Sequence, residues 1–179
     1  GILSKLRGYN FNSERTAELK PTISVIIPAL DEEGNIEATV DEVLDAIEGR
    51  FSDCEILIFD DCSSDRTGTI TDKLAAKDKR VKITHNKRTM GLGYNYKKGV
   101  ELARHDYVIL VPGDNQITRD SLIRMFDLIN KADIVIPYID NYWIRPLSRQ
   151  GISRLFTKIM NLLFWLDLSY YNGPVIHRR

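Results

Sequence analysis

The run ISVIIP at residues 23–28 decides the fold. It is short, continuous and rich in β-branched side chains, which is typical of a buried strand in a parallel sheet. Apolar residues then recur at helical spacing from Ile36 to Ile47, and Gly49 is a plausible end of that helix. A buried strand followed directly by an amphipathic helix indicates the start of a βαβ unit.

The same alternation continues along the chain. Further strands are predicted at EILIFDD (55–61), VKIT (81–84), DYVILV (106–111) and DIVIP (133–137). Helices are predicted from Ser64 or Asp65 to about Lys77, over residues 93–104, and after Thr118, which is expected to cap its helix. Strands that alternate with helices predict an α/β fold of Rossmann-like type, with a mostly parallel central sheet flanked by helices.

Composition restricts the class of protein. The 25 Lys and Arg residues balance the 25 Asp and Glu residues of the 179-residue chain, so no basic field favours nucleic acid as a partner. Cys54 and Cys62 flank a predicted strand that would hold them beyond disulfide reach, which favours a reducing, cytoplasmic setting. His85, His105 and His177 show no metal-ligand spacing and are expected to be structural or exposed.

Chain organisation is expected to be simple. Residues 1–20 are polar without a clear period and are expected to form an N-terminal extension, followed by one catalytic domain over residues 21–179. The chain begins at Gly1 without Met and stops at VIHRR (175–179), so a domain truncated at its C-terminus is expected. No apolar run approaches the roughly 18 residues needed to span a bilayer.

Acidic residues follow three of the predicted strands, in PALDEEGN (28–35), DDCSSD (60–65) and PGDNQ (112–116). Ligands of open α/β sheets bind beyond the carboxyl ends of the strands. Because like charges that converge on one rim repel each other, a cation is expected between them, and a divalent metal ion is the obvious candidate. The plainer alternative is that these residues are turn formers and helix caps.

Familiar nucleotide-binding loops are absent from the sequence. The first strand–helix turn lacks G-x-G-x-x-G, and the GLG at 91–93 has Tyr96 in the place of the third glycine. No G-x-x-x-x-G-K-[ST] motif occurs either. The phosphates of a nucleotide ligand would therefore be held through a metal ion and a few cationic side chains.

Four segments, taken in order, resemble the family 2 glycosyltransferases: VIIPALDEEGNI, FDDCSSDRTGTI, GLGYNYKKGVELARHDYVILVPGDNQ and DIVIP. The resemblance covers about residues 22–179 and points to the branch of dolichol-phosphate mannose synthase and related polyprenyl-phosphate glycosyltransferases. It implies the nucleotide-diphospho-sugar transferase fold of GT-A type. It also implies inverting transfer of a sugar from a UDP- or GDP-linked donor to a polyprenyl phosphate.

The resemblance also assigns donor-site residues. The segment that lies along the nucleotide is matched by Pro28, Ala29, Leu30 and Glu32, with Asp31 where Asn is usual. Asp61 matches the residue that contacts the base, while Asp65 is expected to serve as the cap of the next helix. Gly91 and Gly93 match a loop that packs close to the sugar nucleotide, although both are also ordinary turn glycines.

Asp114 and Gln116 match the metal segment of the family. The resemblance implies that Asp114 bridges Mg²⁺ or Mn²⁺ to the diphosphate, where the ion would offset charge on the leaving nucleoside diphosphate. Pro112 replaces the first Asp of that segment, so the metal loses one carboxylate. Ile139 and Val175 stand where the family has arginines, so the donor and acceptor need not be GDP-mannose and dolichyl phosphate.

A phosphate acceptor is favoured by the absence of a carboxylate pair in residues 140–179, where Asp140 and Asp167 stand alone. A phosphate with a second pKa of about 6 is already a nucleophile at neutral pH and needs cations rather than a general base. Arg149, with Ser153 and Thr157, resembles the R-x3-S-x3-N helix of the family and is the candidate catalytic cation. Other cations available to the acceptor are Arg145, Arg154 and Lys158.

The segment LSRQGISRLFTKIMNLLFWLDL (147–168) combines dense apolar residues with basic residues in its first half. This pattern suits a helix in a membrane interface, where a lipid-linked acceptor would approach, or a core helix with a basic solvated face. The interfacial reading places the protein at the cytoplasmic face of a membrane. Two alternatives remain, namely transfer to a saccharide or protein hydroxyl in cell-envelope glycan synthesis, and a catalytically weak nucleotide-sugar-binding domain.

Overall fold

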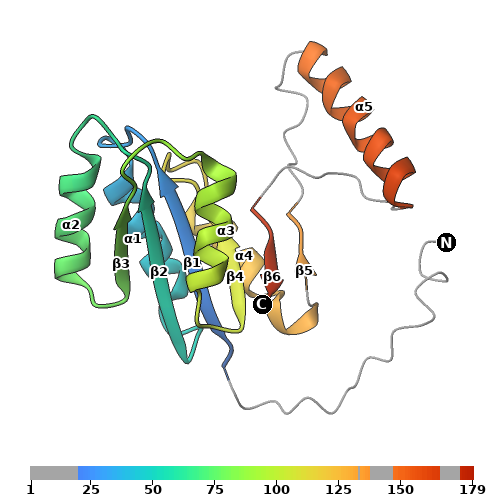
Figure 1. The fold of residues 1–179 in the computed structure, drawn as a ribbon. Coiled ribbons are helices and arrows are strands. Elements are labelled where there is room, and N and C mark those ends of the chain that lie inside the picture. Colours follow the sequence, from blue (N-terminus) through green and yellow to red (C-terminus); the bar gives the residue numbers. More distant parts are fainter. Residues whose placement is uncertain (1–19, 133, 138–146, 166–173) are drawn as a thin grey trace.

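The computed structural model describes residues 20–132, 134–137, 147–165 and 174–179, and Figure 1 shows its fold. Within these residues a six-stranded sheet has the order β3-β2-β1-β4-β6-β5. Its parallel part consists of β1 (Thr22–Ala29), β2 (Asp53–Asp60), β3 (Val81–His85) and β4 (Tyr107–Leu110). Strand β6 (Ile176–Arg178) is antiparallel to both β4 and β5 (Ile134–Val135).

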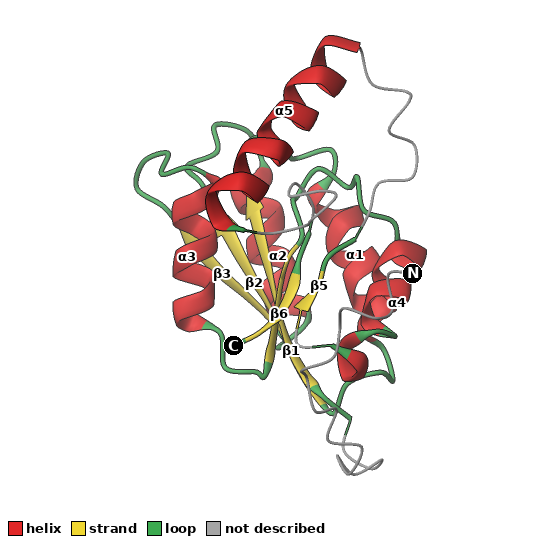
Figure 2. Ribbon diagram, turned by 90° about the vertical axis from the view of Figure 1, so that its right-hand side faces the viewer, coloured by secondary structure: helices red, strands yellow, loops and turns green. Residues whose placement is uncertain are grey.

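Helices cover both faces of this sheet (Figures 1 and 2). One face packs against α1 (Ile36–Ile47), α2 (Thr67–Lys77) and α4 (Arg119–Phe126). The other face packs against α3 (Leu92–Leu102). A short 3-10 helix (Ile129–Lys131) precedes β5, and α5 (Leu147–Phe164) stands apart from the sheet, on the side where the parallel strands end.

Strand β1 lies at the centre of the parallel part, and its residues from Ile23 to Ala29 are all buried. Alternate side chains enter different cores: Val25 lies under α1, α2 and α4, whereas Ile26 lies under α3. Gly99 of α3 approaches this strand so closely that a Cβ atom would lie 2.6 Å from Ile26 Cγ2. The helix therefore packs directly on β1 because residue 99 has no side chain.

The first four predicted strands and their parallel βαβ order are confirmed. The fifth predicted strand is present as Ile134–Val135, and it pairs antiparallel with β6 rather than parallel; Asp133 lies outside the described residues. The structure adds β6, which the sequence analysis missed because three residues that include His177 and Arg178 carry no alternation signal. Tyr96 Oη of α3 contacts His177 Nε2 at 2.6 Å. This contact connects β6, in the antiparallel part of the sheet, to helix α3.

Helix starts show one confirmation and one correction. Thr118 caps α4 as predicted, because its side chain accepts the backbone N–H of Ser121. Helix α2 begins at Thr67 and Arg66 occupies its N-cap position, so neither Ser64 nor Asp65, the two predicted caps, lies at that position. Asp65 nevertheless accepts the N–H of Thr67 at 2.9 Å, and its other oxygen accepts an N–H from outside the helix. Asp65 therefore connects the start of α2 to the loop that follows β1.

Two smaller expectations concern the cysteines and the membrane. Cys54 and Cys62 are both free thiols, as their separation along the chain predicted. Among the residues that the structure describes, no helix is both long enough and apolar enough to cross a bilayer. The predicted N-terminal extension falls almost wholly within residues 1–19, which lie outside the described part of the chain.

Candidate active site

The carboxyl ends of β1, β2 and β4 form one rim, which brings three segments of the sequence together. Ala29 is in register with Asp60, and its carbonyl accepts the N–H of Asp61 at 2.8 Å. On the other side of β1, the carbonyl of Pro28 accepts the N–H of Gly113 at 3.1 Å. The end of β1 thus lies between the acidic segments that follow β2 and β4, as the parallel topology predicted.

The loop after β1 (residues 30–35) and the loop after β2 (residues 61–66) are bonded into one unit. Three backbone N–H groups of the first loop donate to side chains at the second: Asp31 to Ser63 Oγ at 3.0 Å, Glu32 to Thr67 Oγ1 at 2.8 Å, and Glu33 to Asp65 Oδ2 at 3.0 Å. In the opposite direction, Ser64 donates its N–H to Asp31 Oδ1 at 2.7 Å. These reciprocal bonds fix the shape of the rim.

This bonding changes the charge argument made from the sequence. The carboxylates at the rim were expected to need a cation, but Asp31 and Asp65 accept backbone N–H groups instead. Glu33 pairs with Arg66 at 3.0 Å, and that hydrogen bond lowers the pKa of Glu33. In the described ranges, no cluster of three or more His, Cys, Asp or Glu side chains is arranged to hold a metal ion. Repulsion between these carboxylates therefore does not by itself require a metal.

The residues assigned to the nucleotide segment occupy the end of β1 and the turn after it. Pro28 and Ala29 are buried, whereas the Leu30 side chain is exposed on the rim. Glu32 Oε2 accepts Asn35 Nδ2 at 2.8 Å, and the carbonyl of Glu32 accepts the first amide of α1. This segment presents backbone and one apolar side chain rather than free charges.

Asp61 is only 4% exposed and holds the loop that follows β3. Its Oδ1 accepts Asn86 Nδ2 at 2.7 Å and the N–H of Met90 at 2.9 Å, and its Oδ2 accepts the N–H of Gly91 at 2.8 Å. Burial raises the pKa of Asp61, but the hydrogen bonds outweigh burial and leave this pKa below its usual range. The hydrogen bonds that lower this pKa come from Met90, Asn95, Asn86 and Gly91, so neighbouring groups engage most of the acceptor positions of the carboxylate.

Gly91 and Gly93, at the start of α3, leave open space. Gly91 has φ of +87°, a conformation in which a side chain would be strained. Gly93 lies in the first turn of α3, and a Cβ atom at either glycine would meet nothing within 4 Å. The absence of side chains here leaves room at the rim beside Asp61.

The segment after β4 is both a tight turn and a support for Asp114. A Cβ atom on Gly113 would lie 3.1 Å from Ala29 Cβ, and the Gly113 carbonyl accepts Thr39 Oγ1 at 3.0 Å. This backbone is therefore held against β1 and α1. Asp114 is half-buried, and its Oδ1 accepts the N–H of Gln116, whose side chain is exposed, at 3.3 Å. No ion pair engages Asp114 within the described part of the chain, so its carboxylate can take a cation.

The acceptor side of the predicted site is less fully described. The backbone of Arg149 lies in α5, but its side chain lies outside the described residues. Four other residues named for the acceptor side lie wholly outside the described residues, namely Ile139, Asp140, Arg145 and Asp167. Val175 is half-buried just before β6. The rim is thus built from described residues. The roles predicted for Arg149, Asp140 and Asp167 on the acceptor side stay predictions.

Asp60 and His85, for which the sequence analysis named no partner, lie at the same rim. Asp60 is buried at the end of β2, and its Oδ2 lies 2.8 Å from Nδ1 of His85 at the end of β3. Asp60 Oδ1 accepts the N–H of Ser63 at 3.0 Å. Both residues end neighbouring parallel strands in the same register, which is the signal that could have paired them.

Helix α5 shows an inverted distribution of side chains. Its half-buried positions include the polar residues Gln150, Ser153, Thr157 and Asn161. Large apolar side chains point away from the protein, with Leu162 at 78% and Trp165, just after the helix, at 96% exposure. Other exposed apolar residues of the helix are Ile152, Leu155, Phe156, Ile159, Leu163 and Phe164. In the described residues, the exposed side chains of α5 are therefore mostly apolar and its half-buried ones mostly polar.

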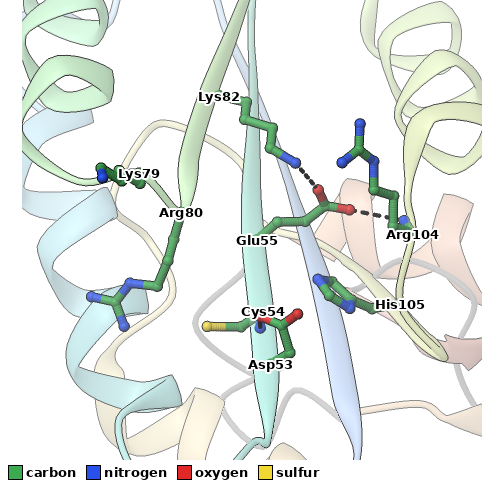
Figure 3. A pocket seen from close by; sticks show the side chains of 8 residues that line it. All are labelled: Asp53, Cys54, Glu55, Lys79, Arg80, Lys82, Arg104 and His105. Carbon is green, nitrogen blue, oxygen red and sulfur yellow. Dashed lines mark hydrogen bonds and ion pairs between the residues drawn. The ribbon is translucent and has the colours of Figure 1, made fainter.

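Figure 3 shows a pocket of about 230 Å³ at the opposite, amino-terminal edge of the sheet. Its floor is Glu55, a buried carboxylate that accepts Lys82 Nζ at 2.5 Å, Ser24 Oγ at 2.8 Å and the Arg104 N–H at 2.8 Å. Arg80 turns toward Asp78, which its Nη2 contacts at 2.6 Å. Because Lys82 and Arg80 have carboxylate partners, this pocket is a structural ion-pair site rather than part of the rim.

The mostly parallel sheet with helices on both faces has the nucleotide-diphospho-sugar transferase fold of GT-A type. Glucosyl-3-phosphoglycerate synthase from Mycobacterium tuberculosis, solved in complex with uridine diphosphate, superposes with a TM-score of 0.64 at 17% sequence identity. That match covers 88% of this chain and 57% of the synthase chain, and it concerns the fold alone. The family model for glycosyl transferase family 2 matches residues 24–173, so the chain belongs to this family.

Two curated relatives agree with this family. The uncharacterized glycosyltransferase EpsJ of Bacillus subtilis is 31% identical over 117 residues, which cover 64% of this chain and 33% of EpsJ. The undecaprenyl-phosphate mannosyltransferase of Micrococcus luteus is 30% identical over 117 residues, which cover 64% of this chain and 46% of that protein. The chain therefore spans between about a third and about a half of the length of these two relatives.

Proposed function

We propose that this chain transfers a sugar, with inversion, from a nucleoside diphosphate to a polyprenyl phosphate at a membrane surface. The carrying observation is the inverted helix α5, which borders the strand-end side of the sheet with its apolar side chains outward. A rim that binds a water-soluble donor, next to a face suited to lipid, fits a reaction between a soluble and a lipid-linked substrate. The branch of polyprenyl-phosphate glycosyltransferases combines these two needs.

The donor is proposed to lie along the rim at the end of β1. Pro28, Ala29, Leu30 and Glu32 would line the nucleotide, and Asp61 would contact the base. The space beside Gly91 and Gly93 would admit the sugar nucleotide. The M. tuberculosis synthase of the same fold was solved with uridine diphosphate, which supports a diphosphate donor.

A divalent cation, Mg²⁺ or Mn²⁺, is proposed to accompany the donor. Asp114 is the half-buried carboxylate without an ion-pair partner in the described part of the chain, and the Gln116 side chain is exposed two residues later. One carboxylate fits such an ion, because Mg²⁺ is commonly held by one or two carboxylates together with substrate phosphates. The ion would supply positive charge to the leaving diphosphate.

The reaction needs no general base on the protein. A phosphate oxygen of the acceptor donates its electron pair to the anomeric carbon of the sugar, and the bond from that carbon to the β-phosphate oxygen breaks. The departing electron pair stays on the nucleoside diphosphate, and attack from the opposite face inverts the anomeric centre. Arg149 is proposed to hold the acceptor phosphate, since a planar guanidinium binds phosphate oxygens in pairs.

The membrane is proposed as the second partner of the rim. Exposed leucines and Trp165 along α5 would enter the interfacial region of the bilayer, and the exposed Lys158 would lie near anionic headgroups. A nucleotide-sugar donor and the free cysteines favour the cytoplasmic face for this surface. The undecaprenyl-phosphate mannosyltransferase relative of M. luteus supports this class of acceptor.

The test begins with calorimetric titration of UDP and GDP, each with and without Mn²⁺, into the full chain. The nucleotide that binds then selects a radiolabelled nucleotide sugar for incubation with undecaprenyl phosphate in detergent. Label in an organic-extractable product supports the proposal. Label only in a water-soluble saccharide or protein product would instead establish a hydroxyl acceptor, and metal-dependent binding without turnover would establish a binding domain.

A further inference from the structure

His85 is bonded on both sides of its ring to carboxylates from two different elements. Its Nδ1 lies 2.8 Å from Asp60 Oδ2 at the end of β2, and its Nε2 lies 3.0 Å from Asp72 Oδ1 in α2. Gly68 of α2 leaves room for this group, since a Cβ atom there would lie 3.0 Å from Asp60 Oδ2. The arrangement connects β2, β3 and α2 at the carboxyl edge of the sheet.

Only the protonated ring can donate a hydrogen bond to both carboxylates. A neutral imidazole has one N–H, so it can donate to one carboxylate while its other nitrogen faces the second carboxylate with a lone pair. An imidazolium donates to both. In agreement, the hydrogen bonds that His85 donates to Asp60 and Asp72 raise the pKa of His85. Burial raises the pKa of Asp60, but the hydrogen bonds from Ser63 and His85 outweigh it, so the pKa of Asp60 lies below its usual range.

A short chain of bonds leads from this ring to the donor rim. Asp60 Oδ1 accepts the N–H of Ser63 at 3.0 Å, and Ser63 Oγ accepts the N–H of Asp31 at 3.0 Å. Cys62, which directly precedes Ser63, has φ of +69°, and Asp31 has φ of +55°. Residues other than glycine adopt these angles only when their surroundings hold them, so the loop depends on the bonds that Asp60 makes.

We propose that His85, as an imidazolium, is a positioning residue for the donor site. It holds the Asp60 carboxylate in the orientation that fixes Ser63 and, through Ser63, the Asp31 turn beside the nucleotide segment. This inference rests on the proposed function for its ligand, a nucleoside diphosphate. His85 acts through Asp60 and does not touch the substrate, so it should affect donor affinity rather than the chemical step.

The positioning should depend on pH. The charged groups that act on the ring are Asp60 from β2 and Asp72 from α2, and both favour its protonation. Because the pKa of His85 is raised in the folded protein, the imidazolium is complete below its ordinary pKa of about 6.5 and is lost as pH rises through the higher folded value. Donor affinity should therefore fall toward alkaline pH.

The binding test uses calorimetry with UDP or GDP, whichever binds, from about pH 6 to about pH 9. We expect the wild-type dissociation constant to rise about tenfold across this window, the size of one lost charge-assisted hydrogen bond. His85→Gln should bind about tenfold more weakly than the wild type at about pH 6 and about equally at about pH 9, and His85→Lys should bind tightly without pH dependence. His105→Gln, at the opposite edge of the sheet, is the matched control and should behave as wild type.

Asp72→Asn sharpens the test, because it removes one charge that favours the imidazolium and leaves Asp60 in place. The pH at which affinity falls should move lower, while affinity at low pH is retained. Equal affinities of wild type and His85→Gln at about pH 6, or a flat wild-type profile, would overturn the inference while leaving nucleotide binding established.

Amide hydrogen exchange of residues 61–64 tests the positioning without any nucleotide. His85→Gln should speed exchange of the Ser63 amide about tenfold at about pH 6, whereas His105→Gln should not. Unchanged exchange in His85→Gln would overturn the inference. If no nucleotide binds the wild-type chain, the proposed function fails, and this exchange measurement still decides whether His85 positions the loop.

Discussion

Asp61 accepts the backbone N–H of Gly91 at 2.8 Å, and this bond fixes the loop after β3 against the end of β2. The residue that we propose for base recognition is thus also the residue that shapes the loop proposed to lie beside the sugar nucleotide. A substitution at Asp61 should therefore affect stability and donor binding together, which separates it from residues that touch only the ligand.

Asp61→Asn should lower the free energy of unfolding by about 1–3 kcal/mol. The new amide group would point a donor at the N–H of Met90 or Gly91, and buried donors would lose their acceptor. Urea denaturation measures this change, with Asp53→Asn at the exposed start of β2 as control. A change below about 0.5 kcal/mol, as for an ordinary surface site, would show that the Asp61 bonds are not needed for the loop.

Two glycines of α3 should respond in opposite ways to alanine. Gly99→Ala should lose about 1–3 kcal/mol, because its Cβ would be forced to within 2.6 Å of Ile26 Cγ2 in a packed core. Gly93→Ala faces open space and should gain up to about 1 kcal/mol from helix propensity. Thermal unfolding of both variants gives the comparison. Weaker donor binding by the stable Gly93→Ala would support the assignment of that space to the sugar nucleotide.

Asp114→Asn should separate activity from stability. Its carboxylate accepts one long bond at 3.3 Å, so the free energy of unfolding should change by less than about 0.5 kcal/mol. Loss of the proposed metal ligand should reduce metal-dependent turnover by about a hundredfold or more. Asp120→Asn in the first turn of α4 is the control. A large loss of stability in Asp114→Asn would mean that this residue serves the turn instead.

Stability should also depend on pH through His85. The raised pKa of His85 adds stability that is complete below about pH 6.5 and lost as pH rises through its folded value, while the lowered pKa of Asp60 adds stability that is lost in acid. Because the ring is 41% exposed, the His85 contribution should be on the order of 1 kcal/mol or less. Urea denaturation of wild type and His85→Gln should differ near neutral pH and converge at alkaline pH.

The double variant Leu155→Ser, Leu162→Ser should lose membrane binding without loss of stability. Both side chains are more than half exposed on α5, so their removal leaves no cavity. If they enter a bilayer, each contributes about 1.5–3 kcal/mol, and cosedimentation with anionic vesicles should fall at least about tenfold. Leu128→Ser, at an exposed apolar position outside α5, is the control. Equal cosedimentation of both variants would argue that α5 meets a protein partner instead.

Much of the fold could be read from the sequence because buried parallel strands have a strong local signature. ISVIIP and EILIFDD are apolar on both faces, and the helices between them repeat their apolar residues at helical spacing. The position of Asp61 and Asp114 at one rim followed from topology, since parallel strands end at one edge. Strand β6 could not be found in this way, because its antiparallel pairing depends on β4 and β5 rather than on its own residues.

The sequence by itself determined the α/β order, the family resemblance and the candidate donor residues, because each depends on local pattern or on motifs in fixed order. Only the tertiary structure decided how the rim carboxylates are used. Backbone N–H groups of neighbouring loops occupy Asp31, Asp61 and Asp65, and His85 pairs with Asp60 across two strands. Hydrogen bonds of this kind join residues far apart in the chain, and no local pattern records which donor meets which carboxylate.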